Sequence, residues 1–332
     1  MNDKTHSEAV GIADIREAAH RLDGVARVTP LLESPFLNEI AGRRVLVKAE
    51  CLQITGSFKF RGGWSTVSAL DPEARARGVI SYSSGNHAQG VAHAAELLGV
   101  PAVIVMPENA PALKLANTRA HGAEVVTYDR VGGESREAIG SEIAEARGLT
   151  LIRPYDEPLV IAGQGTCGLE IAAQARKADV EMADVLVCCG GGGLASGVAL
   201  ALEAEAPGLR VRPVEPQGFD DVARSLASGR IERNPSETGS ICDAIVTPAP
   251  GELTFPVLKR LAGPGLVVSD NEALKAVALA FLRLKIVVEP GGAVALAAAL
   301  LRPDEITGDA VICIATGGNV DPQMFTRALE TL

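Results

Sequence analysis

The sequence predicts an α/β protein with two open, mostly parallel twisted sheets flanked by helices, the smaller domain being inserted into the larger one. The chain has 332 residues, and at ~100–200 residues per domain this length predicts two domains. Hydrophobic residues make up 47% and aromatic residues 3%, so Ala, Val, Leu and Ile fill the core, as in helices stacked on parallel strands. Short β-rich runs also alternate with helical patterns, which is typical of parallel strands joined by helical crossovers.

The elements follow from the spacing of the apolar residues. A helical pattern with mixed charges opens the chain. The β-rich runs predict strands over 79–82, 102–106, 124–127, 185–189, 210–215 and 310–315. Apolar stripes at helical spacing predict helices over 86–98, 112–121, 134–147, 194–205, 271–284 and 293–300. Pro, Gly and Ser are spread through 226–254, which predicts a long irregular connection.

The domain division rests on where complete sheets can form. The middle of the chain, 53–155, holds enough strands for a small sheet of its own. The run VLVKAE at 45–50 then belongs with the strands of the C-terminal part. We therefore expect a large domain of residues 1–52 plus 156–332 and an inserted small domain of residues 53–155.

Charge and composition exclude several classes of function. With 31 Lys and Arg against 41 Asp and Glu, the formal net charge is −10, and no basic stripe that could bind a nucleic acid is visible. The longest apolar stretch, 291–301, is shorter than the ~20 residues of a membrane span. The N-terminus lacks the pattern of a secretory signal, and the six cysteines show no metal-ligand spacing. We expect a cytoplasmic protein that binds neither nucleic acid nor membrane.

A tetraglycine loop predicts a phosphate-binding site. Gly190 to Gly193 follow a predicted strand and open a predicted helix at Leu194. Backbone amides without Cβ atoms can converge there on an anion, and the helix dipole favours negative charge. Gly190, Gly192 and Ala195 also fit the GxGxxA pattern of dinucleotide-binding enzymes, with Glu215 as the ribose-binding acid. A nicotinamide-dependent dehydrogenase therefore stays open as an alternative at this point.

Two further segments suggest amine and carboxylate chemistry. Lys59 lies between Phe58 and Phe60, and partial desolvation by these rings would lower the pKa of its amine and suit it to Schiff-base formation. The loop Ser81-Tyr82-Ser83-Ser84-Gly85-Asn86-His87 connects a strand to a helix and combines hydroxyls, an amide and helix-start N–H groups. Such a loop suits a carboxylate and a phenolic oxygen. We expect His87 to be a structural hydrogen-bonding residue and not a base.

Six motifs in order resemble one enzyme family. They are SFKFRG at 57–62, SSGNHAQG at 83–90, AGQGT at 162–166, GGGGL at 190–194, VEPGGA at 288–293 and ATGGNVD at 315–321. Together they resemble the pyridoxal-phosphate (PLP) enzymes of fold type II, which have a tryptophan synthase β-like fold. The most similar branch is that of serine/threonine dehydratase and serine racemase. The resemblance implies a homodimer that acts on a small-molecule amino acid.

The resemblance also implies roles for single residues. Lys59 would form the Schiff base with the cofactor and take the α-proton, and Ser84 would be the acid/base on the opposite face. Gly190, Gly191, Gly192, Gly193 and Leu194 would hold the phosphate, Asn86 the ring phenolate and Thr316 the pyridine nitrogen, with Phe58 and Glu289 also at the cofactor. Ser83, Ser84, Asn86 and His87 would bind the substrate carboxylate, mainly through main-chain N–H groups.

The segment after the predicted strand 210–215 resembles the divalent-metal loop of the serine racemase branch. Glu215, the Phe219 carbonyl and Asp221 would there be the ligands of Mg²⁺ or Ca²⁺, since all are oxygen donors that suit a hard cation. The alternative is that the aspartates simply begin a helix, where negative charge is favourable. Glu215 cannot serve both a metal and a ribose, so the metal and dinucleotide hypotheses exclude each other.

The expected reaction is removal of water and ammonia from a β-hydroxy amino acid, L-threonine or L-serine, to give a 2-oxo acid. A neutral Thr316 at the pyridine nitrogen favours expulsion of a β-substituent. Tyr155 stands where threonine dehydratases of this branch carry an aromatic residue. Arg136 resembles an arginine that reaches a second carboxylate, although it could equally be a surface residue paired with a neighbouring glutamate. Serine racemase and 3-hydroxyaspartate dehydratase are therefore the alternatives within the family.

Overall fold

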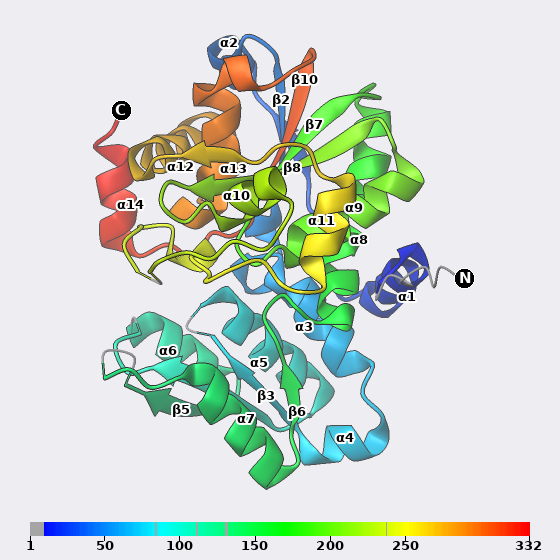
Figure 1. The fold of residues 1–332 in the computed structure, drawn as a ribbon, viewed down its shortest axis with the longest axis vertical. Coiled ribbons are helices and arrows are strands. Elements are labelled where there is room, and N and C mark those ends of the chain that lie inside the picture. Colours follow the sequence, from blue (N-terminus) through cyan, green and yellow to red (C-terminus); the bar gives the residue numbers. More distant parts are fainter. Residues whose placement is uncertain (1–9, 84, 111, 130–131, 237) are drawn as a thin grey trace.

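The computed structural model describes residues 10–83, 85–110, 112–129, 132–236 and 238–332. Its larger sheet has six strands in the order β1-β2-β10-β7-β8-β9, and all neighbours in it are parallel except β1 and β2. Segments from both ends of the chain meet in this sheet, which lies in the upper half of Figure 1. Its strands are β1 (Leu31–Glu33), β2 (Arg44–Lys48), β7 (Ala183–Cys188), β8 (Leu209–Pro216), β9 (Leu266–Val268) and β10 (Ala310–Ile314).

The smaller sheet has four strands in the order β5-β4-β3-β6, all of them parallel. It is formed entirely from the middle of the chain and lies in the lower half of Figure 1. Its strands are β3 (Val79–Tyr82), β4 (Ala102–Pro107), β5 (Glu124–Tyr128) and β6 (Thr150–Ile152).

The pairing of β2 with β10 confirms that the strand near residue 45 belongs with the C-terminal part. The register is parallel and places Val45 opposite Val311. The strand ends at Lys48, because the chain turns into a short 3₁₀ segment at Glu50–Leu52. The division into domains at residues 53 and 155 is consistent with this strand order and stays a proposal.

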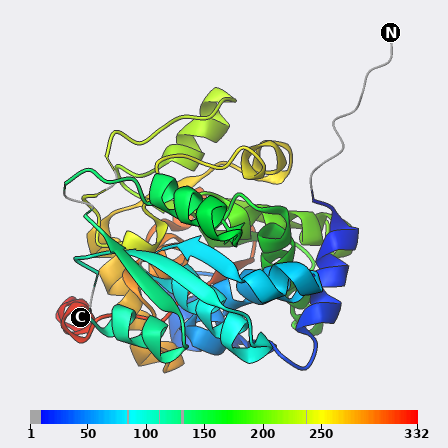
Figure 2. The same ribbon diagram turned by 90° about the horizontal axis from the view of Figure 1, so that it is seen from below.

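Helices cover both faces of the larger sheet, which explains its continuous apolar strands. Val45 and Val47 face the core formed with α12 and α13, whereas Leu46 faces the core formed with α8 and α9. In Figure 2, α1 and α14 lie on opposite sides of the molecule. The helices are α1 (Ile12–Leu22), α2 (Pro35–Ala41), α3 (Lys59–Ser68), α4 (Pro72–Arg77), α5 (Asn86–Leu98), α6 (Ala112–Ala120), α7 (Arg136–Arg147), α8 (Pro158–Lys177), α9 (Gly193–Glu205), α10 (Asp221–Ser228), α11 (Thr254–Leu261), α12 (Asp270–Leu284), α13 (Pro290–Leu301) and α14 (Pro322–Leu329).

The predicted strands and helices are all present, with ends that differ by a few residues. The three-residue strands β1, β6 and β9 and the 20-residue helix α8 were not predicted from the sequence. Helix α8 is buried along most of its length, so it lacks the polar face that makes a helix visible in a sequence. No helix in the described ranges has the length and hydropathy needed to cross a membrane.

Candidate active site

A pocket lies between the two sheets and collects side chains from both. It encloses about 1010 Å³ of space that is free of protein atoms, part of it open to solvent. The site lies at the carboxyl ends of β3 and β7, where open α/β sheets usually bind ligands. Its lining includes Phe58, Lys59, Ser83, Asn86, His87, Arg136, Tyr155, Gly190, Gly191, Gly192, Gly193, Leu194, Glu289 and Thr316.

The tetraglycine loop connects β7 to α9 and forms one wall of the pocket. Gly192 has φ +91°, a conformation that residues with a side chain rarely adopt. A Cβ atom on Gly191 would lie 2.2 Å from the ring of Tyr155. The Gly191 carbonyl accepts hydrogen bonds from Thr254 Oγ1 at 2.6 Å and from the Gly251 amide at 3.1 Å. The loop is therefore fixed by its neighbours and keeps the N-terminus of α9 open toward the pocket.

Lys59 is the first residue of α3, and its amine lies in the pocket. The Lys59 Nζ donates a hydrogen bond to the Pro154 carbonyl at 2.6 Å and lies 5.1 Å from the centroid of the Phe58 ring. Burial lowers the pKa of Lys59 to about 8. The sequence predicted that the rings of Phe58 and Phe60 would both lie beside the Lys59 amine, and this was wrong for Phe60. The Phe60 ring instead packs against Trp64 in the hydrophobic core beside the smaller sheet, because consecutive residues point to different sides of a helix.

Asn86 begins α5 and is held by side chains on both of its amide atoms. Its Nδ2 donates to Glu289 Oε1 at 2.5 Å, and its Oδ1 accepts from Asn319 Nδ2 at 2.8 Å. A Cβ atom on Gly317 would lie 2.2 Å from Glu289 Oε1, which explains the glycine of the ATGGNVD motif. Glu289 therefore orients Asn86, and Asn319 is a second orienting residue that was not singled out from the sequence.

Ser83 directly follows β3, and His87 is the second residue of α5. His87 is buried, and its Nε2 lies 3.3 Å from the Ile152 carbonyl. Burial and the neighbouring Lys59 charge lower the pKa of His87 to about 3, so the imidazole is neutral. Its Nδ1 has no hydrogen-bond partner within the described part of the chain. Ser84, the expected acid/base of the opposite face, lies outside the described residues.

Thr316 and Cys188 line the pocket and are both buried. Burial raises the pKa of the Cys188 thiol to about 11, and a hydrogen bond with the Thr316 side chain partly opposes this shift. The Thr316 carbonyl accepts a hydrogen bond from the Phe58 amide at 3.1 Å. This bond ties the ATGGNVD loop to the segment that carries Lys59.

Tyr155 and Arg136 also line the pocket. Tyr155 packs against the glycine loop, and burial raises the pKa of its phenol to about 12. The Arg136 guanidinium lies 5.8 Å from the centroid of the Tyr82 ring, and its Nε donates to Glu137 Oε1 at 2.8 Å. The two interpretations of Arg136 are therefore compatible, because the residue pairs with a neighbouring glutamate and also faces the pocket.

The three expected metal ligands are not among the residues that line this pocket and lie between the end of β8 and the start of α10. Both carboxylate oxygens of Glu215 accept backbone hydrogen bonds, from Val222 at 2.9 Å and from Ala223 at 2.7 Å. Glu215 is fully buried and both of its oxygens face the backbone of α10, so it is not presented to a ribose as the acid of a dinucleotide site would be. Asp221 Oδ1 accepts from Asn234 Nδ2 at 2.6 Å. Its Oδ2 has no partner among the residues that the structure describes.

One wall of the pocket was not predicted from the sequence. This wall comes from the long irregular connection before α11, whose sequence carries no signal beyond its predicted lack of regular structure. The residues concerned are Asp243, Ala244, Ile245, Val246 and Thr247.

The two-sheet fold and the pocket between the sheets define the class of fold type II PLP enzymes. The chain belongs to the family described as "Pyridoxal-phosphate dependent enzyme", whose model matches residues 22–317. It is 43% identical over 318 residues to L-threo-3-hydroxyaspartate ammonia-lyase of Saccharomyces cerevisiae, covering 96% of this chain and 95% of that relative. Family membership overturns the dehydrogenase alternative.

Two solved structures show the same fold. A T.th. threonine deaminase has a TM-score of 0.87 and 45% sequence identity, covering 94% of this chain and 99% of that one. Maize serine racemase has a TM-score of 0.89 and 39% identity, covering 97% of each chain.

Proposed function

We propose that this protein is a PLP-dependent ammonia-lyase that converts a β-hydroxy amino acid to a 2-oxo acid, with 3-hydroxyaspartate as its preferred substrate. The observation that carries the proposal is that one pocket brings together Lys59, the glycine loop and Arg136. Lys59 and the loop fit a lyase of this family, and the arginine distinguishes a dicarboxylic substrate from L-serine or L-threonine. The hydroxyaspartate lyase relative supports the same substrate class.

The residues of the pocket fit the cofactor. The glycine loop together with Leu194 would hold the phosphate, because a Cβ atom on Gly191 would collide with Tyr155 and the helix start favours an anion. Asn86, oriented by Glu289, would donate to the phenolic oxygen, and Thr316 would meet the pyridine nitrogen. Phe58 would contact the same group. When bound, PLP supplies an electron sink for the electrons released at the substrate Cα.

Lys59 would move the proton at the substrate Cα. Its lowered pKa leaves a useful fraction of the amine neutral near pH 8, and a neutral amine can accept a proton. Ser84 would act on the opposite face. Thr316 would keep the pyridine nitrogen unprotonated, because a hydroxyl does not stabilise the charged ring as a carboxylate does. This arrangement favours loss of the β-hydroxyl over racemisation.

The substrate would be held at both ends. The main-chain N–H groups of Ser83, Asn86 and His87 would bind its α-carboxylate at the start of α5. Arg136 would bind the second carboxylate, and its position against the Tyr82 ring limits the directions in which the guanidinium can point. Tyr155 would close the pocket between these two ends.

The test compares Arg136→Gln with the wild type by measuring 2-oxo acid from L-threo-3-hydroxyaspartate, L-serine and L-threonine. We expect kcat/KM for hydroxyaspartate to fall about 10- to 100-fold, since a hydrogen bond to a charged group contributes about 1.5–3 kcal/mol. The values for serine and threonine should change little. Glu137→Gln is the control, because it removes the ion pair and leaves the guanidinium. Equal losses on all three substrates would refute the specificity role, and no 2-oxo acid from any of them would refute the lyase itself.

We also propose that Glu215, the Phe219 carbonyl and Asp221 bind Mg²⁺ or Ca²⁺. Burial raises the pKa of Asp221 to about 6, and burial with the nearby Asp221 charge raises that of Glu215 well above its usual range. A divalent cation would neutralise this buried acidic pair and give Asp221 Oδ2 a partner. In protein supplied with Mg²⁺ or Ca²⁺ and free of Zn²⁺, EDTA should therefore lower the melting temperature of the wild type and have no effect on Asp221→Asn. An unchanged wild-type melting temperature would leave Glu215 as a cap of α10.

We further propose a cytoplasmic homodimer, as the family resemblance implies. Phe36 and Ile40 of α2 and Phe281 of α12 are exposed apolar side chains that suit a subunit interface. All six cysteines are free thiols, in keeping with a reducing compartment. Sedimentation of Phe36→Glu and of the wild type tests the dimer, and a wild type that sediments as a monomer would refute it.

A further inference from the structure

A cluster of two histidines and a glutamate lies on the surface of the small-sheet half, away from the pocket. His93 and Glu96 are three residues apart on α5 and share one helix face, and His121 follows directly after the last residue of α6. Their possible ligand atoms all lie within 4.8 Å of one another. No other group of three or more histidines, cysteines and acids with this spacing occurs in the described ranges.

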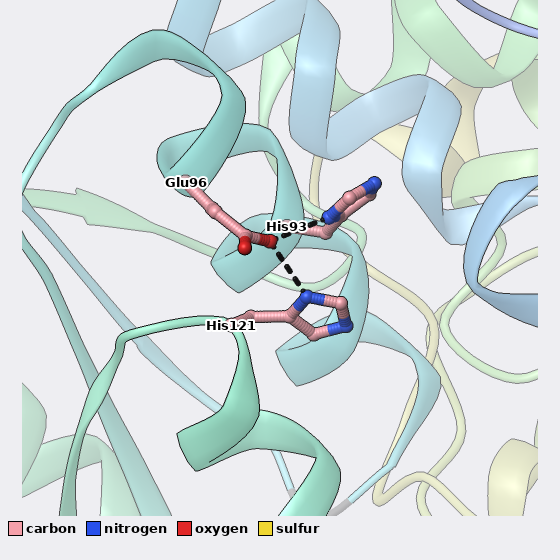
Figure 3. A group of neighbouring side chains, drawn as sticks. All are labelled: His93, Glu96 and His121. Carbon is pink, nitrogen blue, oxygen red and sulfur yellow. Dashed lines mark hydrogen bonds and ion pairs between the residues drawn. The ribbon is translucent and has the colours of Figure 1, made fainter.

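Both imidazoles present the same nitrogen to the same carboxylate oxygen. His93 Nδ1 lies 2.8 Å from Glu96 Oε2, and His121 Nδ1 lies 2.8 Å from the same oxygen. Figure 3 shows the carboxylate between the two rings, with the Nδ1 atoms of both rings turned toward it. Two imidazole nitrogens, one from α5 and one from the residue after α6, therefore meet at one carboxylate oxygen.

We propose that His93, Glu96 and His121 form a binding site for a single divalent transition-metal ion, with Zn²⁺ as the best-suited ion. Ligand atoms at about 2.0–2.2 Å from Zn²⁺ lie roughly 3.3 Å apart in a tetrahedron, so a small shift of the Glu96 carboxylate would admit the ion. A water molecule would complete the coordination. Imidazole nitrogens disfavour Mg²⁺ and Ca²⁺, which separates this site from the oxygen-donor site at Glu215.

The surroundings support a cation here in two ways. Glu96 lies in the last turn of α5 and His121 follows the end of α6, so the negative ends of two helix dipoles lie near the site. The His93 ring also packs against the buried Phe60, with 5.7 Å between ring centroids, which restricts its orientation before any ion binds. The three side chains are 22%, 43% and 25% exposed, so an ion can enter from solvent.

Metal binding would connect α6 to α5. Asn86 and His87 begin α5 and line the pocket, and His93 lies seven residues further along, about 10 Å at the rise of an α-helix. The ion would therefore stabilise the helix that carries these two residues without touching the pocket. This inference does not depend on the reaction proposed above.

The experiment uses the untagged holoenzyme, because a histidine tag would itself bind Zn²⁺. Zn²⁺ is titrated by calorimetry in buffer containing Mg²⁺, which occupies any oxygen-donor site. The variants are His121→Gln and Glu96→Gln, since replacing His93 would disturb its contact with Phe60. His20→Gln is the matched control, because His20 is an exposed histidine on α1 outside the cluster.

We expect the wild type and His20→Gln to bind one equivalent of Zn²⁺ that His121→Gln and Glu96→Gln bind at least about tenfold more weakly. Zn²⁺ should also raise the melting temperature of the wild type and of His20→Gln only, because an ion that binds the folded state stabilises it. The proposal is overturned if the wild type binds no Zn²⁺, or if His121→Gln binds it with the wild-type stoichiometry and affinity.

Discussion

At the scale of single residues, the proposed chemistry depends on how the surroundings of Lys59 change the pKa of its amine. Burial lowers the pKa of this amine from 10.5 to about 8. In cofactor-free protein only the neutral amine attacks the cofactor aldehyde, so we expect the rate of PLP uptake to rise with pH around a midpoint of about 8. The rate is followed by the visible absorbance of the bound cofactor. A midpoint near 10.5 would mean that Lys59 is solvated like a surface lysine, and Lys59→Ala should show no such band at any pH.

The lowered pKa of Lys59 also makes the free energy of unfolding depend on pH. The folded-state pKa lies below the unfolded value, so between about pH 8 and pH 10.5 the unfolded chain binds more protons than the folded one. In that window this lysine makes the free energy of unfolding of cofactor-free protein increase with pH. Lys59→Met should lack this contribution, and urea unfolding of both proteins at several pH values measures the difference. Parallel pH profiles would contradict the assigned burial.

At the scale of elements, glycines of α8 allow this helix to pack closely against its neighbours. A Cβ atom on Gly163 would lie 2.6 Å from the Arg61 carbonyl and 2.7 Å from the Ser65 Cβ, both on α3. Gly163→Ala improves helix propensity by roughly 1 kcal/mol, but overpacking of this kind costs about 1–3 kcal/mol, and we expect net destabilisation in urea unfolding. Gly11→Ala is the control, since its nearest neighbour is 3.9 Å away. A more stable Gly163→Ala would show that the two helices can separate freely.

At the scale of the whole molecule, a buried charge network connects the segment after β2 with α3 and α8. Arg61 donates to both carboxylate oxygens of Glu50 at 2.8 Å and to Glu170 Oε1 at 2.7 Å. Lys48 donates to Glu170 Oε2 at 2.5 Å. Because Arg61 lies two residues after Lys59, this network fixes the start of the helix that carries the reactive amine.

Removing Arg61 should leave the buried Glu50 carboxylate without the cation that contacts it, with the Thr29 hydroxyl still donating to its Oε1 at 2.5 Å. Burial by itself raises the pKa of Glu50, but the charge and hydrogen bonds of Arg61 outweigh burial and lower it. This carboxylate therefore stabilises the wild type above its unfolded pKa of about 4.5, and the contribution is lost as the pH falls through the lower folded value. Arg61→Met should cost about 3–5 kcal/mol at pH 7, measured by urea unfolding.

Arg61→Met should also invert the pH dependence of the free energy of unfolding that Glu50 contributes. With Arg61 gone, burial would raise the pKa of Glu50, so Arg61→Met should regain stability as the pH falls from about 7 toward 5. Arg16→Met, which removes an exposed ion pair with Glu205, is the control and should change stability by less than about 1 kcal/mol. A loss of that small size in Arg61→Met would show that the Thr29 hydroxyl and the Lys48 charge are enough to stabilise the Glu50 carboxylate.

The sequence by itself determined the fold class, the main strands and helices, and the candidate lysine and glycine loop of the pocket, because these features follow from local patterns. Alternating apolar runs specify strands and crossovers, and the glycines near 190 and the lysine at 59 stand in short motifs. Only the tertiary structure decided which rings desolvate Lys59, that the connection around Asp243 walls the pocket, and that Arg136 faces it. It also brought His121 to His93 and Glu96, although 25 residues separate Glu96 from His121. Such contacts depend on how distant elements pack, and the spacing of residues along the chain carries no record of them.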